Sequence, residues 1–108
     1  MSVRVSDDFL RAVEADADFT LQWPVESADP EMTQVVKARE LWNTLIGCAH
    51  RTAEPGIILW DRQHRYSTSS VYPGFRNEST NPCGEIAMQG GDSCRLIAIN
   101  LYLSLIHI

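Results

Sequence analysis

The sequence has no long apolar run, no basic excess and few cysteines, and each absence narrows what the 108-residue chain can do. No stretch reaches the roughly 18 apolar residues that a membrane-spanning helix needs. The first residues run quickly into Asp7 and Asp8, which does not match the apolar region of a secretory signal peptide. We therefore expect a cytoplasmic protein with no membrane partner.

The charge and the cysteine content exclude further classes of protein. Lys and Arg number 9 against 14 Asp and Glu, so the formal net charge is −5. A nucleic-acid partner is not expected, because phosphate binding needs a basic excess. Three cysteines are too few for a secreted disulfide scaffold of this size. A zinc site built from Cys48, His50, Cys83 and Cys94 would lack any Cys-x-x-Cys pair, so we expect no metal, and Cys48 is expected to pack as a small apolar residue.

The apolar pattern of the chain predicts an α/β fold. We expect strands over residues 2–5, 19–25, 33–36, 56–60 and 95–101, a short helix capped by Ser6, and a longer helix from 38 to 53. The continuous apolar run at 56–60 is typical of a strand buried on both faces. Tryptophans 23, 42 and 60 all fall in apolar patterns and are expected in the core. Asp61, at the end of the buried strand, is suited to contacting a ligand or to capping a helix.

The apolar periodicity lapses after Asp61, and polar and turn residues dominate from Ser67 to Cys94. Structureless loops of more than about 15 residues are usually functional. Asn81, Cys83 and Glu85 are spaced by two residues in this loop. In an extended segment such side chains point the same way, so we expect them to converge on one ligand. This pattern predicts an active-site loop with Cys83 as the reactive atom, Glu85 as the general acid or base and Asn81 as an orienting donor. On spacing alone, a turn around a buried structural cysteine fits equally well.

Residues 79–86, Ser-Thr-Asn-Pro-Cys-Gly-Glu-Ile, are followed by Asp-Ser-Cys-Arg-Leu at 92–96 and Ile-Asn-Leu at 99–101. Together they resemble the finger-loop signature of the adenosylcobalamin-dependent (class II) ribonucleotide reductases. Three earlier segments are similar to the same family in the right order: 2–9 with 12–14, 38–42, and 54–58 with 60–61. Residues 88–91, Met-Gln-Gly-Gly, depart from the proline-containing stretch of that family.

The resemblance implies a ten-stranded α/β barrel that holds this finger loop, and radical chemistry on a ribonucleoside di- or triphosphate. Cys83 would carry a thiyl radical that abstracts the 3′-hydrogen, Glu85 would take the 3′-hydroxyl proton, and Asn81 would hydrogen-bond the sugar. Cys94 would be one thiol of the redox pair. The substrate-binding residues implied are Thr80, Asn81, Pro82, Cys83, Gly84 and Glu85.

The resemblance also implies adenosylcobalamin as the cofactor, a thioredoxin-like or other dithiol reductant, and nucleotide effectors in the full-length enzyme. We expect residues 1–102 to be a segment of the catalytic barrel, inactive and marginally stable alone, and residues 103–108 to be a non-native tail. Two alternatives stay open: a non-catalytic small binding or interaction module, and a segment of a diiron-class reductase large subunit. The Asn-Pro-Cys-Gly-Glu sequence and the short separation of Cys83 from Cys94 favour the cobalamin class.

Overall fold

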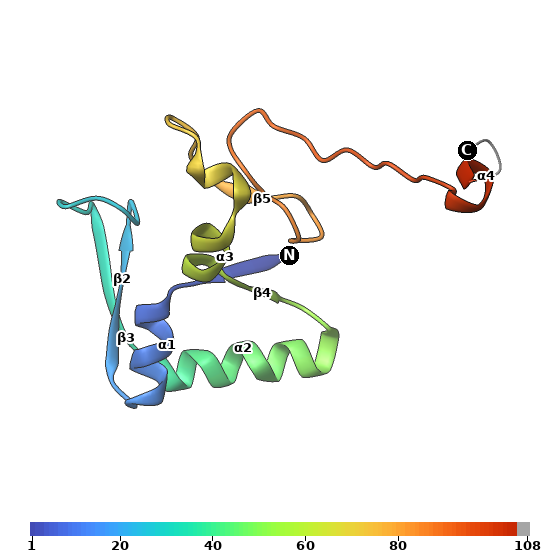
Figure 1. Cartoon of the computed structure of the whole chain (residues 1–108). Coiled ribbons are helices and arrows are strands. Elements are labelled where there is room, and N and C mark those ends of the chain that lie inside the picture. The colour runs from blue at the N-terminus through green and yellow to red at the C-terminus, as the bar shows by residue number, and fades with distance from the viewer. Residues whose placement is uncertain (106–108) are drawn as a thin grey trace.

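The computed structural model describes residues 1–105, without the side chains of residues 104 and 105, so the last part of the expected tail lies outside the described residues. Helices and strands alternate along the chain (Figure 1). Their order is β1 Ser2–Val5, α1 Asp7–Glu14, β2 Asp18–Trp23, β3 Met32–Lys37, α2 Ala38–Thr52, β4 Gly56–Leu59, α3 Trp60–Tyr66, a 3₁₀ turn Thr68–Val71, β5 Ser79–Thr80, β6 Ala87–Met88 and α4 Leu101–Leu105.

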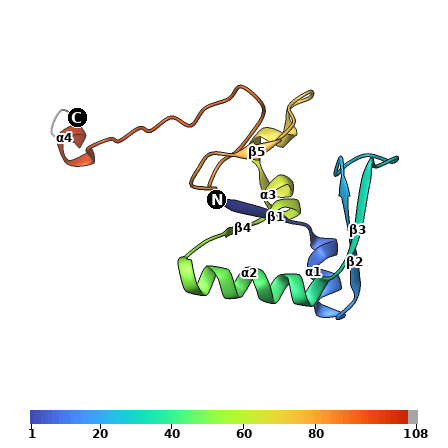
Figure 2. The ribbon, with the colours of Figure 1, turned by 180° about the vertical axis from the view of Figure 1, so that it is seen from behind.

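A parallel pair of strands forms the centre of the fold. β1 and β4 pair from Ser2 with Gly56 to Val5 with Leu59, although some fifty residues separate them in the sequence. In both views of the ribbon α2 lies on one side of this pair, and α3 with the β5 segment lies on the other (Figures 1 and 2). Parallel pairing through a helical crossover is the arrangement of α/β proteins, which confirms the mixed α/β class.

The core is small and gathers around α1. Within the described residues the buried apolar side chains are Val5, Phe9, Val13 and Ala38. The helix begins as the sequence predicts, since the Ser6 hydroxyl accepts a hydrogen bond from the Phe9 amide at 3.1 Å. Its apolar face packs on α2 and on the start of β2.

The antiparallel hairpin β2–β3 is confirmed as secondary structure, but most of its expected burial is wrong. Phe19 packs against the core, whereas Leu21 is 38%, Trp23 62% and Val25 61% exposed. Beyond Phe19 the hairpin extends past the end of α1, so the described residues cover these side chains only in part (Figure 1). At the base of the hairpin a hydrogen bond to Asp18 raises the pKa of Lys37 above its ordinary value.

The strand at 56–60 is shorter and less buried than its apolar run predicts. It ends at Leu59, and Trp60 instead begins α3 and is half-buried. Leu59 is 37% exposed, because β4 has β1 as its neighbour on one edge and no further described strand on the other. The prediction of a strand buried on both faces is therefore wrong for the described residues.

The strand expected at 95–101 is also wrong. Residues 91–100 have no regular structure beyond a turn, and the chain then enters α4. Leu96 is 96% and Ile97 84% exposed, since a strand needs a neighbour for its backbone hydrogen bonds and none is present among residues 1–105. This extended arm, visible in Figures 1 and 2, raises the radius of gyration to 18.5 Å, against about 13 Å for a compact chain of this length.

The described strands form three separate two-stranded sheets and no closed barrel. The expected ten-stranded barrel is thus not seen within residues 1–105. No helix of the described part of the chain has the length and apolar character needed to cross a membrane.

Candidate active site

The segment that the sequence left without structure contains helix α3, the 3₁₀ turn and a short hairpin. In that hairpin β5 and β6 pair Ser79 with Met88 and Thr80 with Ala87. The Glu78 amide extends the ladder by donating to the Met88 carbonyl at 2.8 Å. Residues 81–86, which carry the predicted reactive groups, therefore form the connecting turn of a hairpin. We call residues 81–86 the cysteine turn.

Asn81 holds the cysteine turn together from inside. Its side chain is buried, with 4% of its surface exposed. The Asn81 Oδ1 atom accepts from the Ile86 amide at 3.0 Å, and Nδ2 donates to Glu85 Oε1. The main chain of Asn81 adds two bonds, donating to the Ile86 carbonyl at 3.1 Å and accepting from the Gly84 amide at 3.0 Å. Asn81 and Glu85 thus meet as the sequence predicts, but through a turn and not through an extended segment.

Cys83 lies at the tip of the turn and is exposed. It follows Pro82, whose fixed φ suits the second position of a tight turn, and precedes Gly84 at φ +87°. That left-handed conformation strongly favours glycine, because a Cβ atom there clashes with the following carbonyl. The alternative of a buried structural cysteine is wrong for Cys83, since its side chain is not enclosed.

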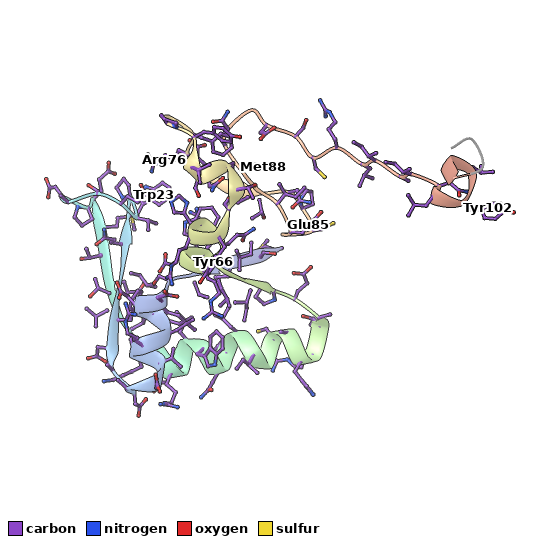
Figure 3. The ribbon with its side chains drawn as sticks, viewed as in Figure 1. Trp23, Tyr66, Arg76, Glu85, Met88 and Tyr102 are labelled. Atoms are coloured by element: carbon purple, nitrogen blue, oxygen red, sulfur yellow. The ribbon has the colours of Figure 1, made fainter. Side chains whose placement is uncertain are left out.

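A pocket of about 360 Å³ opens beside the Cys83 tip. Its walls come from β1, β4, α3 and the turn, and they comprise Ser2, Gly56, Ile57, Ile58, Leu59, Arg62, Gln63, Cys83 and Gly84. Figure 3 shows Glu85 on the same loop, and Ser2 near the start of the chain lines the pocket together with Cys83 and Gly84. The pocket wall therefore carries the Cys83 thiol and the Arg62 guanidinium, whereas Glu85 lies next to Gly84 outside the lining residues.

Two side chains from other elements reach the hairpin, and the sequence analysis missed both. Arg4 of β1 donates to the Glu78 carbonyl at 2.8 Å, and its guanidinium lies 4.6 Å from the centre of the Trp60 ring. Gln63 of α3 donates to the Gly84 carbonyl at 3.1 Å. No sequence signal marks Gln63, because the helix that carries it lies where apolar periodicity is lost. Arg4 could have been noted as the outward residue of an alternating strand.

The remaining residues that the sequence singled out lie apart from the turn or serve the fold. Asp61 caps α1 from a distance in sequence, since its Oδ2 atom accepts from the Asp7 amide at 2.7 Å. Cys48 is half-buried on α2, where its sulfur accepts from Arg51 at 3.5 Å. Cys94 is half-buried in the segment after β6, and all three cysteines are free thiols. Within residues 1–105 no group of three or more His, Cys, Asp or Glu side chains is arranged to hold a metal ion.

A thiol, a carboxylate and a buried amide on one turn match the residue types of a known family of enzymes. The family model described as the ribonucleotide reductase barrel domain matches residues 1–105. The chain belongs to this family. The family match and the relatives below favour neither alternative, the binding module nor the diiron-class segment.

The curated relatives that match this chain are named vitamin B12-dependent ribonucleotide reductases. The chain is 37% identical over 101 residues to the vitamin B12-dependent ribonucleoside-diphosphate reductase of Thermoplasma acidophilum, covering 94% of this chain and 12% of that protein. It is 36% identical over 102 residues to the protein of the same name from Mycobacterium tuberculosis, covering 94% and 14%. A vitamin B12-dependent ribonucleotide reductase of Bradyrhizobium diazoefficiens is 33% identical over 100 residues, covering 93% and 8%. The chain therefore spans roughly a tenth of the length of these relatives.

Proposed function

We propose that this chain supplies the radical-bearing loop of an adenosylcobalamin-dependent ribonucleotide reductase, and that its residues act inside a ten-stranded α/β barrel completed by further protein. The observation that carries the proposal is the cysteine turn, which places an exposed thiol beside a pocket and pairs a buried amide with a carboxylate. The substrate is a ribonucleoside di- or triphosphate whose ribose lies against Thr80 and the cysteine turn. We name residues 80–85 as its binding residues.

Cys83 supplies the reacting sulfur. As a thiyl radical it takes the hydrogen atom from C3′ of the ribose, so that an S–H bond forms and a carbon-centred radical remains on the sugar. Glu85 accepts the 3′-hydroxyl proton while the 2′-hydroxyl leaves as water. Asn81 orients the sugar and holds the Glu85 carboxylate, a contact that already exists in the free turn. At the end of the cycle Cys83 returns its hydrogen to C3′ and becomes a thiyl radical again.

Reduction at C2′ needs two electrons and two protons, which a pair of thiols provides. Cys94 and a second thiol lose their hydrogens and form a disulfide, while the C2′–O bond breaks and a C2′–H bond forms. A thioredoxin-like or other dithiol partner then restores both thiols by disulfide exchange. Cys94 suits this task in one respect, because it is a free thiol and is not fully buried.

Adenosylcobalamin, when bound, supplies the first radical by homolysis of its carbon–cobalt bond. Cys83 fits such a partner because its sulfur stands at the exposed tip of the turn, where a group held elsewhere in the protein reaches it. We assign no residue of this chain to holding the cofactor itself. Nucleotide effectors likewise belong to the full-length protein in this proposal.

The proposal is tested in a chimera of the Thermoplasma acidophilum relative, in which the 101 matched residues are replaced by the corresponding residues of this chain. Purified chimera is assayed for deoxynucleotide formation with adenosylcobalamin and a dithiol reductant. We expect turnover, which Cys83→Ser abolishes. Cys94→Ser is expected to leave at most a single-turnover-like trace of product, because the pair of thiols that supplies the two electrons is incomplete.

Cys48→Ser is the matched control, since Cys48 lies on α2 and does not line the pocket. It should leave turnover unchanged. Retained multiple turnover in Cys83→Ser would refute the radical role, and equal losses in all three variants would point to damage to the fold.

A further inference from the structure

The cysteine turn is joined to helix α3 by a single side chain. Gln63 Nε2 donates to the Gly84 carbonyl at 3.1 Å across 21 residues of sequence, in a partly buried contact. Among the described residues this is the one hydrogen bond that leaves residues 81–86 for another element, since the other bonds of the turn are internal to it.

The internal hydrogen bonds of the turn and the Gln63 hydrogen bond restrain different things. The bonds of Asn81 set the shape of the turn. Because both ends of each bond lie within the turn, they do not fix its position relative to α3 and β4. The Gly84 carbonyl lies one residue beyond Cys83, and the backbone on both sides of it is held by the bond from the Gly84 amide to the Asn81 carbonyl and by the bond from the Ile86 amide to Asn81 Oδ1. A donor that holds the Gly84 carbonyl therefore limits the position of the Cys83 sulfur relative to α3 and β4.

The Gln63 hydrogen bond also affects the geometry of the pocket. Gln63, Cys83 and Gly84 all line the same 360 Å³ cavity, so a shift of the turn changes the distance from the thiol to the opposite wall. Hydrogen-atom transfer depends steeply on such distances, and a misplacement of about 1 Å has large effects on catalysis.

We propose that Gln63 is a positioning residue, which acts through the Gly84 carbonyl to hold the Cys83 thiol at the pocket. The meaning of this position for catalysis depends on the function proposed above, whereas the restraint itself does not. A donor is required at Gln63, and an acceptor of the same shape in its place repels the carbonyl.

The experiment uses Gln63→Glu in the 108-residue chain. Nuclear magnetic resonance measures two quantities: the nuclear Overhauser effect between side chain 63 and the Gly84 Hα atoms, and the exchange protection of the Gly84 and Ile86 amides. At pH 7 the carboxylate cannot donate, so we expect the Overhauser contact to vanish and protection to fall about fivefold, the equivalent of one ordinary hydrogen bond. Below about pH 4, near the ordinary pKa of glutamate, the neutral acid donates again and both signals recover.

The titratable or charged groups beside this position are Arg62 on α3 and Cys83 and Glu85 in the turn. The wild-type chain contains all three, so its own pH series serves as the reference. Gln34→Glu, at an exposed position of β3, is the matched control and should follow the wild type at both pH values.

Gln63→Met keeps the side-chain length and removes the donor. It should lose the Overhauser contact and the amide protection at pH 7, and neither signal should recover below about pH 4. Wild-type protection in Gln63→Glu or Gln63→Met at pH 7 would overturn the proposal. So would a loss in Gln63→Glu that spreads over amides of α1 and β1, because that pattern indicates general unfolding. None of these signals requires turnover, so a chimera without activity would count against the proposed function and leave this result standing.

Discussion

Exchanging the hydrogen-bonding roles of Asn81 and Glu85 tests the architecture of the cysteine turn. In the native turn the Asn81 amide donates to the Glu85 carboxylate and its carbonyl oxygen accepts from the Ile86 amide. Asn81→Asp keeps the acceptor for Ile86 but removes the donor, so two carboxylates face each other. Adding Glu85→Gln then supplies a donor from the opposite side.

The magnitude follows from the bonds that change. A hydrogen bond to a charged group contributes about 1.5–3 kcal/mol, and Asn81 is too buried for water to replace it freely. We expect Asn81→Asp to lower the free energy of opening the turn by about 2–3 kcal/mol at neutral pH. That loss corresponds to amide exchange faster by about 30- to 150-fold at Gly84 and Ile86. The double variant should recover all but about 1 kcal/mol.

The assay is amide hydrogen exchange at neutral pH on the wild type, both single variants and the double variant. Asn43→Asp, at an exposed position of α2, controls for the added negative charge. The reasoning is refuted if the double variant exchanges as fast as Asn81→Asp. It is equally refuted if Asn81→Asp leaves the Ile86 amide as protected as in the wild type.

Two further predictions concern the fold. Phe9→Ala should cost about 3–5 kcal/mol, because Phe9 is 5% exposed and packs edge-on against Phe19 with ring centres 5.2 Å apart; circular dichroism should then show a large loss of helix at room temperature, and an unchanged melting curve would contradict the assigned core. Replacing Leu96 and Ile99 by lysine should change the unfolding free energy by less than about 0.5 kcal/mol, because these side chains are 96% and 70% exposed. Light scattering should show less self-association in that variant, whereas a lower melting temperature would mean that the two side chains are packed.

Local signals in the sequence were sufficient for the two helices in the first half of the chain. Ser6 with two acids behind it marks the start of α1, and the apolar spacing from Leu41 to Ala49 marks α2. These features depend on residues within a few positions of one another, so a single sequence contains them. The αL residue Ala53 ends α2 where the sequence places its end, before Glu54 and Pro55.

Features that depend on partners distant in sequence were not predictable in the same way. The run from Leu96 to Ile99 has the composition of a strand, but without a neighbouring strand among the described residues it stays extended and exposed. Helix α3 lies in a polar stretch, and Asp61 and Arg65 on it bond to Asp7 of α1. Neither contact leaves a trace in local periodicity.

At the site, the sequence identified the correct neighbours for an incorrect reason. An extended segment would have aligned Asn81, Cys83 and Glu85 on one side, whereas the observed turn brings Asn81 to Glu85 and leaves Cys83 at the tip. The signal for the turn was present, since Asn, Pro and Gly occupy the first, second and fourth positions of residues 81–84. The Gly84 amide bonds to the Asn81 carbonyl at 3.0 Å, as that turn requires.

Polar bonds, and not hydrophobic packing, hold the cysteine turn in place. The buried apolar core of the described residues surrounds α1, and it includes no side chain from the β5–β6 hairpin. Arg4 reaches the base of the hairpin from β1, and Gln63 reaches its tip from α3. Directed bonds of this kind fix orientation with few atoms and break one at a time, each at a cost of about 1 kcal/mol. A loop held in this way can be repositioned by a single substitution that leaves the core intact, so the loop and the core should respond separately to mutation.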